Sequence, residues 1–176
     1  SVPARRAAAS AHLRSLTLVA PGLLKQLPAE ERRGEVVELQ HGADAIAQIG
    51  AVLKERSGLQ VLRLISHGKP GALLLGAQRL TAQALSQQAA QVHSWRRALV
   101  SDAQILVYGC RAGATAAGRA LVHTLAQLTG AAVAASEEVV GAGGGVSLGV
   151  QVGTINAGVL AKQRAWEACG LALTPL

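Results

Sequence analysis

Methionine is absent and aromatic side chains are nearly absent from this 176-residue chain, which has no Phe, no Met, two Trp and one Tyr. Half of its residues are nevertheless apolar, so Ala, Leu and Val must fill the core. Because these side chains are small, normal interior density requires sheet and helices to pack closely. The length is that of one domain. We expect this domain over residues 15–176, preceded by a flexible basic arm at residues 1–14.

Long apolar runs and cysteine clusters are absent as well. No run reaches the ~18 residues needed to cross a bilayer, so we expect no membrane insertion. Residues 1–14 hold no continuous apolar stretch, so no signal peptide is visible; this favours a domain of a larger protein, or export without such a signal. The two cysteines, Cys110 and Cys169, are too few for a disulfide framework, and no CxxC or His/Cys cluster indicates zinc. We therefore expect no cofactor.

The charge is unbalanced, with a formal net value of +7. A basic surface attracts phosphates, but the arginines are scattered along the chain. The three aromatic residues, Trp95, Tyr108 and Trp166, do not form a platform on which bases could stack. We interpret the charge as a solvated surface and keep nucleic-acid binding only as a weaker alternative.

Short β-branched runs alternate along the chain with segments of helical periodicity. Parallel strands need crossover connections, which are usually helices. The alternation therefore predicts an α/β fold, a three-layer sandwich with a mostly parallel central sheet and helices on both faces. Right-handed crossovers would make the strands at 61–66 and 105–109 neighbours. The pattern predicts strands at 15–20, 35–40, 61–66, 105–109, 131–136 and 146–155, helices at 44–56, 81–99, 115–130 and 158–168, and a hairpin at 72–80.

Two of these strands end in Gly beside a reactive side chain. The run VLRLIS is followed by His67 and Gly68, and ILVYG is followed by Cys110. Functional groups of open α/β sheets gather beyond the carboxyl ends of the strands, so neighbouring strands would place imidazole and thiol in one crevice. That arrangement suits a cysteine nucleophile with a histidine base, and the amides of Gly68 and Cys110 could form its oxyanion hole. Arg111 and the N-terminus of the helix near Thr115 would lower the pKa of the thiol.

Each of these residues also has a plainer interpretation. His67 taken alone would more often be a loop residue bonded to backbone, and an unpaired cysteine such as Cys110 is often a small buried hydrophobe. Cys169 fits an apolar stripe with Trp166 and is expected in the core. A Cys110–Cys169 disulfide stays open in an oxidising compartment and would silence the nucleophile. The glycine-rich loop at 141–145 precedes a strand and not a helix, so it indicates a loop rim and not a phosphate site.

The segments LISHGKPGALLLGAQRLT, ILVYGCRAG and LAQLTGAAVAASEEVVGAGG together resemble a known family. Strands ending in His-Gly and in Gly-Cys are similar to those of caspase-like (clan CD) cysteine peptidases. The three segments resemble most closely the bacterial domain-of-unknown-function 4347 family, over about residues 60–150. The resemblance implies that His67 is the general base and Cys110 the nucleophile. It also implies a place near the N-terminus of a large secreted adhesin or repeat protein, and so a secreted or cell-surface location. The chain departs from its relatives at Gly145-Val146, where they carry Asp-Trp, which bears on substrate binding and not on the dyad.

Ser136, Glu137 and Glu138 follow the strand after the nucleophile helix and should emerge at the same sheet edge. Several caspase-like peptidases use acidic residues at the base of the pocket to select Arg or Lys before the cut, and this site resembles that arrangement. A carboxylate pairs bidentately with a guanidinium. The alternative is that both glutamates are solvated loop charges.

These observations predict a cysteine endopeptidase with a polypeptide substrate, for which the large parent protein is itself a candidate. The rival prediction is a catalytically inactive module that keeps the fold for interaction or retention of the parent protein, because fold does not dictate function.

Overall fold

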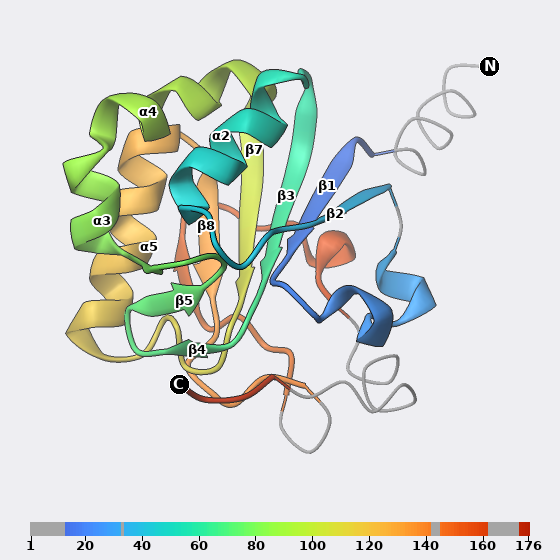
Figure 1. Ribbon diagram of the computed structural model, residues 1–176, viewed down its shortest axis with the longest axis vertical. Coiled ribbons are helices and arrows are strands. Elements are labelled where there is room, and N and C mark those ends of the chain that lie inside the picture. The colour runs from blue at the N-terminus through green and yellow to red at the C-terminus, as the bar shows by residue number, and fades with distance from the viewer. Residues whose placement is uncertain (1–12, 33, 142–144, 162–172) are drawn as a thin grey trace.

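The computed structural model describes residues 13–32, 34–141, 145–161 and 173–176, and Figure 1 shows how they are arranged. At the centre is a six-stranded sheet in the order β2-β1-β3-β7-β8-β9. All neighbouring strands are parallel except the edge pair β8 and β9. The predicted α/β fold with a mostly parallel sheet is therefore confirmed. The strands are β1 (Ser15–Val19), β2 (Glu35–Glu38), β3 (Leu59–Ile65), β7 (Leu99–Tyr108), β8 (Ala132–Ala135) and β9 (Val150–Val152).

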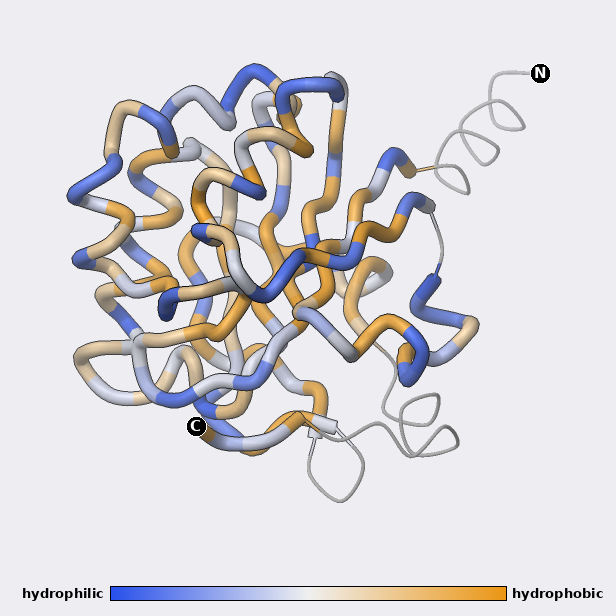
Figure 2. The backbone as a smooth tube through the Cα atoms, in the orientation of Figure 1, coloured by the Kyte–Doolittle hydropathy of each residue, from blue (hydrophilic) through white to orange (hydrophobic). Residues whose placement is uncertain are grey.

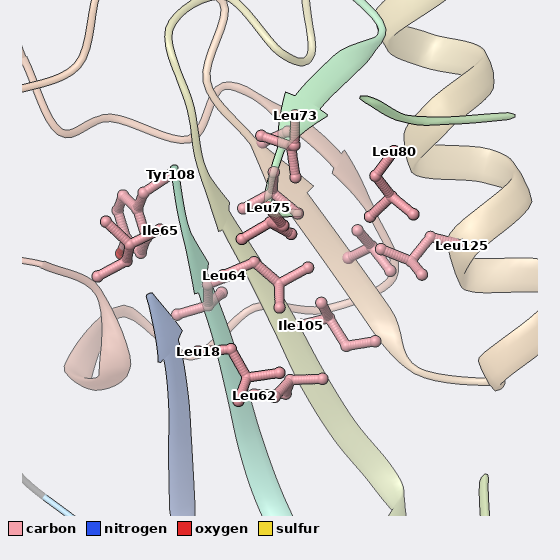
Figure 3. Packing of buried hydrophobic residues seen from close by; sticks show 14 of the residues in the cluster. Leu18, Leu62, Leu64, Ile65, Leu73, Leu75, Leu80, Ile105, Tyr108 and Leu125 are labelled. Carbon is pink, nitrogen blue, oxygen red and sulfur yellow. The ribbon is translucent and has the colours of Figure 1, made fainter. Parts of the chain in front are cut away.

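The carboxyl-terminal halves of the two middle strands, β3 and β7, are buried on both of their faces. Successive side chains of a strand point to opposite sides, and Figure 3 shows Leu62 and Leu64 on one side of β3 and Ile65 on the other. All three are at most 1% exposed, so neither face of this strand meets water. Figure 2 shows the most hydrophobic stretches concentrated on the sheet. The short apolar runs of the sequence are thus those of a doubly covered parallel sheet.

The α-helices pack together as one group against one face of the sheet (Figure 1). Asp44 and Thr81 each accept a hydrogen bond from a first-turn amide, which starts their helices where the sequence predicts. Gly130, at a φ of +73°, ends the helix over Thr115–Thr129 in the left-handed conformation typical of a helix C-terminus. The helix predicted over 81–99 is instead broken at Gln88. The helices are α2 (Ala45–Lys54), α3 (Ala82–Gln87), α4 (Ala89–Ser94) with the 3-10 turn η3 (Trp95–Ala98), and α5 (Thr115–Thr129).

The opposite face is covered by chain that follows β9, which makes the third layer. Arg63 of β3 donates from Nη2 to the carbonyl of Val159 at 3.0 Å. The hydroxyl of Tyr108, at the end of β7, accepts from the amide of Ala161 at 2.8 Å. Burial raises the pKa of Tyr108 to about 12. The helical elements on this side are the 3-10 turn η4 (Ala157–Val159) and, between β1 and β2, the turns η1 (Leu24–Gln26) and η2 (Ala29–Glu31).

A second, three-stranded antiparallel sheet follows β3 directly. It consists of β4 (Gly68–Lys69), β5 (Ala72–Leu74) and β6 (Arg79–Thr81). The predicted hairpin over 72–80 is confirmed as β5 and β6. The additional strand β4 begins with the glycine that follows His67, so this small sheet forms one wall beside the strand ends.

The C-terminal helix predicted from Gly158 does not begin there. Ala157–Val159 form a single 3-10 turn, and Leu160 is extended with ψ at 150°. The rest of that helix, with Trp166 and Cys169, lies outside the described residues, as do residues 1–12 of the predicted arm. None of the helices in the described part of the chain is both long and apolar enough to cross a membrane.

Candidate functional site

His67 and Cys110 emerge at the same edge of the sheet. β3 and β7 are parallel neighbours in which Ile65 pairs with Tyr108, and each reactive residue lies two positions beyond its strand's end. The pairing continues one residue further, since the amide of Ser66 donates to the carbonyl of Tyr108 at 3.0 Å. The predicted placement of both residues at adjacent carboxyl ends is therefore confirmed, and parallel pairing is its cause.

The two loops are packed so closely that a side chain at Gly68 would require the backbone of the neighbouring loop to move. A Cβ there would lie 3.1 Å from both the amide nitrogen and the carbonyl oxygen of Cys110. Gly109 is restricted too, because a Cβ there would overlap the side chain of Leu73 on β5. The glycines beside His67 and Cys110 thus allow backbone to approach backbone.

The loop that carries Cys110 is a tight turn held by the segment after β8. The amide of Arg111 donates to the carbonyl of Glu138 and that of Gly113 to the carbonyl of Ser136, both at 2.8 Å. Arg111 has a φ of +55° and Thr115, at the start of α5, a φ of +62°. Such conformations are rare for residues other than glycine and cost energy that neighbouring contacts must offset. The strain lies immediately next to the reactive thiol.

Both reactive side chains contact the last residues of the chain, 173–176, called the terminal segment below. Sγ of Cys110 donates to the carbonyl of Leu173 at 3.0 Å. Nδ1 of His67 accepts from the amide of Thr174 at 2.8 Å. The amide of Gly68 approaches the carbonyl of Thr174 at 3.4 Å, and its carbonyl accepts from Leu176 at 2.8 Å. The loops of His67 and Cys110, predicted to bind a substrate peptide, therefore contact a peptide of the chain itself.

Burial under this segment decides the protonation of the pair. Cys110 is fully buried, and this burial raises the pKa of its thiol; the opposing effects of the Val140 amide and of Arg111 are smaller. The prediction of a lowered thiol pKa is wrong, because desolvation of the thiolate outweighs the nearby positive charge. Partial burial also lowers the pKa of His67. Both shifts favour the neutral pair, in which the thiol donates and the imidazole accepts.

The predicted pocket residues lie on the loop that holds the nucleophile turn. Ser136 is buried, and its hydroxyl bonds to the amide and carbonyl of Glu138 at 3.1 Å. Glu137 and Glu138 are exposed. Two residues further on, the amide of Val140 reaches Sγ of Cys110 at 3.4 Å. The structure thus brings this loop to the thiol through its backbone, while both carboxylates face solvent.

Sequence reasoning missed the contacts of Val140 and of the terminal segment. Neither carries a signal, because LTPL and VV have no motif and act through backbone atoms.

A separate surface cavity of about 540 Å³ lies between α2 and α4–η3, and none of its lining residues belongs to the loops of His67 or Cys110. In the part of the chain that the structure describes, no group of three His, Cys, Asp or Glu side chains could hold a metal ion.

Comparison with known sequences adds one finding. A family model described as "Domain of unknown function (DUF4347)" matches residues 21–171. No curated protein matches the chain with significance.

Proposed function

We propose that this chain, which belongs to the DUF4347 family over residues 21–171, is a caspase-like cysteine endopeptidase with a His67–Cys110 dyad. The description of the family states no activity, so the proposal is argued from the site. One observation carries the proposal. The thiol contacts the carbonyl oxygen and the imidazole contacts the amide nitrogen of the same peptide bond, that between Leu173 and Thr174. A nucleophile is needed at the carbonyl and an acid–base group at the nitrogen of a bond that is to be cleaved.

The reaction proceeds by acyl transfer. The proton of the Cys110 thiol passes to His67 as Sγ attacks the carbonyl carbon. The amides of Gly68 and Cys110 are the proposed donors to the oxygen that becomes negative; the Gly68 amide now bonds to the carbonyl of Thr174, one residue further along, and has to change partner to take this role. The C–N bond then breaks, and His67 gives its proton to the departing nitrogen. Water, deprotonated by His67, hydrolyses the thioester and restores the free thiol. Because burial raises the pKa of the thiol, proton transfer accompanies attack and no preformed thiolate is required.

The resemblance to domains near the N-terminus of large secreted adhesins suggests where this chemistry acts. We propose that the substrate is polypeptide, with the parent protein as first candidate, and that the domain acts outside the cell or at its surface. Ser136, Glu137 and Glu138 are retained as candidates for the substrate pocket, since their loop borders the thiol.

A non-catalytic interaction module is the second candidate, and a specific observation favours it. Cys110 is wholly shielded from solvent, and its raised pKa works against a reactive thiolate. In such a module the contact between the terminal segment and the loops would be only structural.

A peptide electrophile separates the two candidates. The domain is incubated with a peptidyl acyloxymethyl ketone and, in parallel, with iodoacetamide, and modified cysteines are located by mass spectrometry. If the domain is an endopeptidase, the peptide reagent alkylates Cys110 and leaves Cys169 unmodified. The His67→Ala variant is then alkylated at Cys110 roughly a hundredfold more slowly than wild type, because general base assistance is lost. If neither reagent modifies Cys110, the domain is not a peptidase. The same conclusion follows if Cys110 is modified equally fast with and without His67.

A further inference from the structure

The terminal segment lies along β4 and is hydrogen-bonded to it through backbone atoms. Pro175 forms a parallel bridge with Gly68 of β4, and backbone hydrogen bonds flank that bridge on both sides. On the other side the amide of Leu173 donates to the carbonyl of Val140 at 3.0 Å. Pairing an extended peptide to an exposed strand is a general mode of peptide recognition, in which main-chain bonds supply affinity. Gly68 and Val140 thus bind the backbone of an extended peptide, and residues 173–176 are that peptide.

The orientation of this peptide is specific. The peptide bond between Leu173 and Thr174 is trans, since the structure has no cis peptide bond in its described residues. A planar trans peptide directs its C=O and N–H in opposite directions. Because Cys110 contacts the oxygen and His67 the N–H, this peptide group lies between the thiol and the imidazole. No other backbone amide of the terminal segment contacts both side chains in the described structure.

We propose that the bond between Leu173 and Thr174 is a cleavage site of this domain, cut in cis. The inference rests on the proposed peptidase function and names its substrate. Sγ bonds to the carbonyl carbon of Leu173, and the bond from that carbon to the nitrogen of Thr174 breaks. The thiol proton, carried by His67, becomes the second hydrogen of the new amino terminus at Thr174. One water molecule then releases a carboxylate at Leu173 and returns the proton to Cys110.

The position before the cut takes an apolar side chain in this register. Leu173 is only 2% exposed and belongs to the same hydrophobic cluster as Val140. The three residues after the cut are all exposed, so the domain binds their backbone and not their side chains. An apolar residue before the cut, as Leu173 indicates, and a basic residue selected by Glu137 are alternative predictions for the same substrate position. Cleavage experiments can choose between them.

The cut frees the part of the site beside His67 and Gly68. Cleavage leaves the fragment beginning at Thr174 with its hydrogen bonds to His67 and Gly68. Loss of this fragment would free these two residues for another polypeptide, while Leu173 stays beside Cys110 as the new carboxyl end. The resting domain is thus a peptidase occupied by its own first substrate.

The test follows the mass of the intact chain during incubation at neutral pH. Wild type is expected to be cut between Leu173 and Thr174, which releases the part of the chain that begins at Thr174, and Cys110→Ala is expected to remain whole. Leu173→Arg is expected to slow the loss about tenfold or more, since a charge must enter an apolar position. Leu173→Met, with similar volume, keeps the position apolar and serves as the matched control; circular dichroism checks that both variants fold. A peptide with the sequence of residues 170–176 and its Leu173→Arg counterpart are offered in trans for the same comparison.

The outcomes are distinct. A cut at any other bond, including that between Thr174 and Pro175, overturns the inference while the peptidase stands. The same holds if the chain stays whole although the peptide electrophile modifies Cys110, or if Leu173→Arg is cut as fast as Leu173→Met. An uncut chain whose Cys110 also ignores the electrophile overturns both the inference and the proposed function.

Discussion

Truncating Leu173 should expose the thiol of Cys110 without any requirement for catalysis. The side chain of Leu173 is buried in the hydrophobic cluster, and it is the apolar anchor of a segment whose other side chains are exposed. The carbonyl of the same residue covers Sγ. Release of the segment therefore has to precede attack on the thiol by any reagent.

The size of the effect follows from the loss of that anchor. Leu→Ala at a buried site costs about 2–5 kcal/mol, and the lower part of this range, about 2–3 kcal/mol, suits a terminal segment that can adjust. Because about 1.4 kcal/mol changes an equilibrium tenfold, the open population should rise roughly 30- to 150-fold. Local opening of this kind limits the access of reagents to buried groups.

The assay is alkylation of Cys110 by iodoacetamide at neutral pH, followed by peptide mass spectrometry. Leu176→Ala is the control, because its side chain is 39% exposed and its backbone bond to Gly68 is retained. An unchanged labelling rate in Leu173→Ala, or an equal increase in both variants, would refute the reasoning that the segment shields the thiol.

The protection of Cys110 from alkylation should also depend on pH, because His67 and Cys110 both contact the terminal segment and both titrate. The pKa of His67 is lowered below 6.5, so its contribution to docking is complete above pH 6.5 and is lost as the pH falls through the lowered value, when Nδ1 can no longer accept from Thr174. The pKa of Cys110 is raised above 9.0, so the bond from the thiol is complete below pH 9.0 and is lost as the pH rises through the raised value. Labelling rates divided by those of the unfolded chain should be lowest between these limits. A flat ratio would contradict this assignment.

Three further outcomes are expected. Gly118→Ala should lower the free energy of unfolding by about 3 kcal/mol, because its Cβ would overlap the backbone of Gly113, with the Cα at 2.7 Å. Gly42→Ala is the control in the same denaturant titration, and it should lower the free energy of unfolding far less, because its Cβ meets nothing within 4 Å. Tyr108, the sole tyrosine, should ionise in the folded protein at a pKa of about 12 and not near 10, as followed by absorbance at 295 nm with circular dichroism to confirm folding. If Glu137 selects a basic residue, Glu137→Gln should weaken cleavage after Arg at least tenfold and leave iodoacetamide labelling unchanged, whereas a peptide library preferring apolar residues before the cut would dismiss that role.

The fold was open to prediction from local patterns. Buried parallel strands need short runs that are apolar on both faces, and the runs ending at Ile65 and Tyr108 have this form. Capping side chains and a left-handed glycine marked the helix boundaries at Asp44, Thr81 and Gly130. The break at Gln88 left no such mark, because no Gly or Pro stands there.

The sequence by itself determined that His67 and Cys110 would meet at one edge of the sheet. Strand direction and right-handed crossover are general properties of chains made from L-amino acids, so two strand ends suffice to place two residues. What surrounds them depended on the three-dimensional structure. The terminal segment reaches Cys110 from more than sixty residues away, through backbone atoms that every residue has, and no pattern in a sequence records such a contact. Its arrival buries the thiol and reverses the expected direction of its pKa, because desolvation depends on what covers a group and not on which residues stand beside it in the chain.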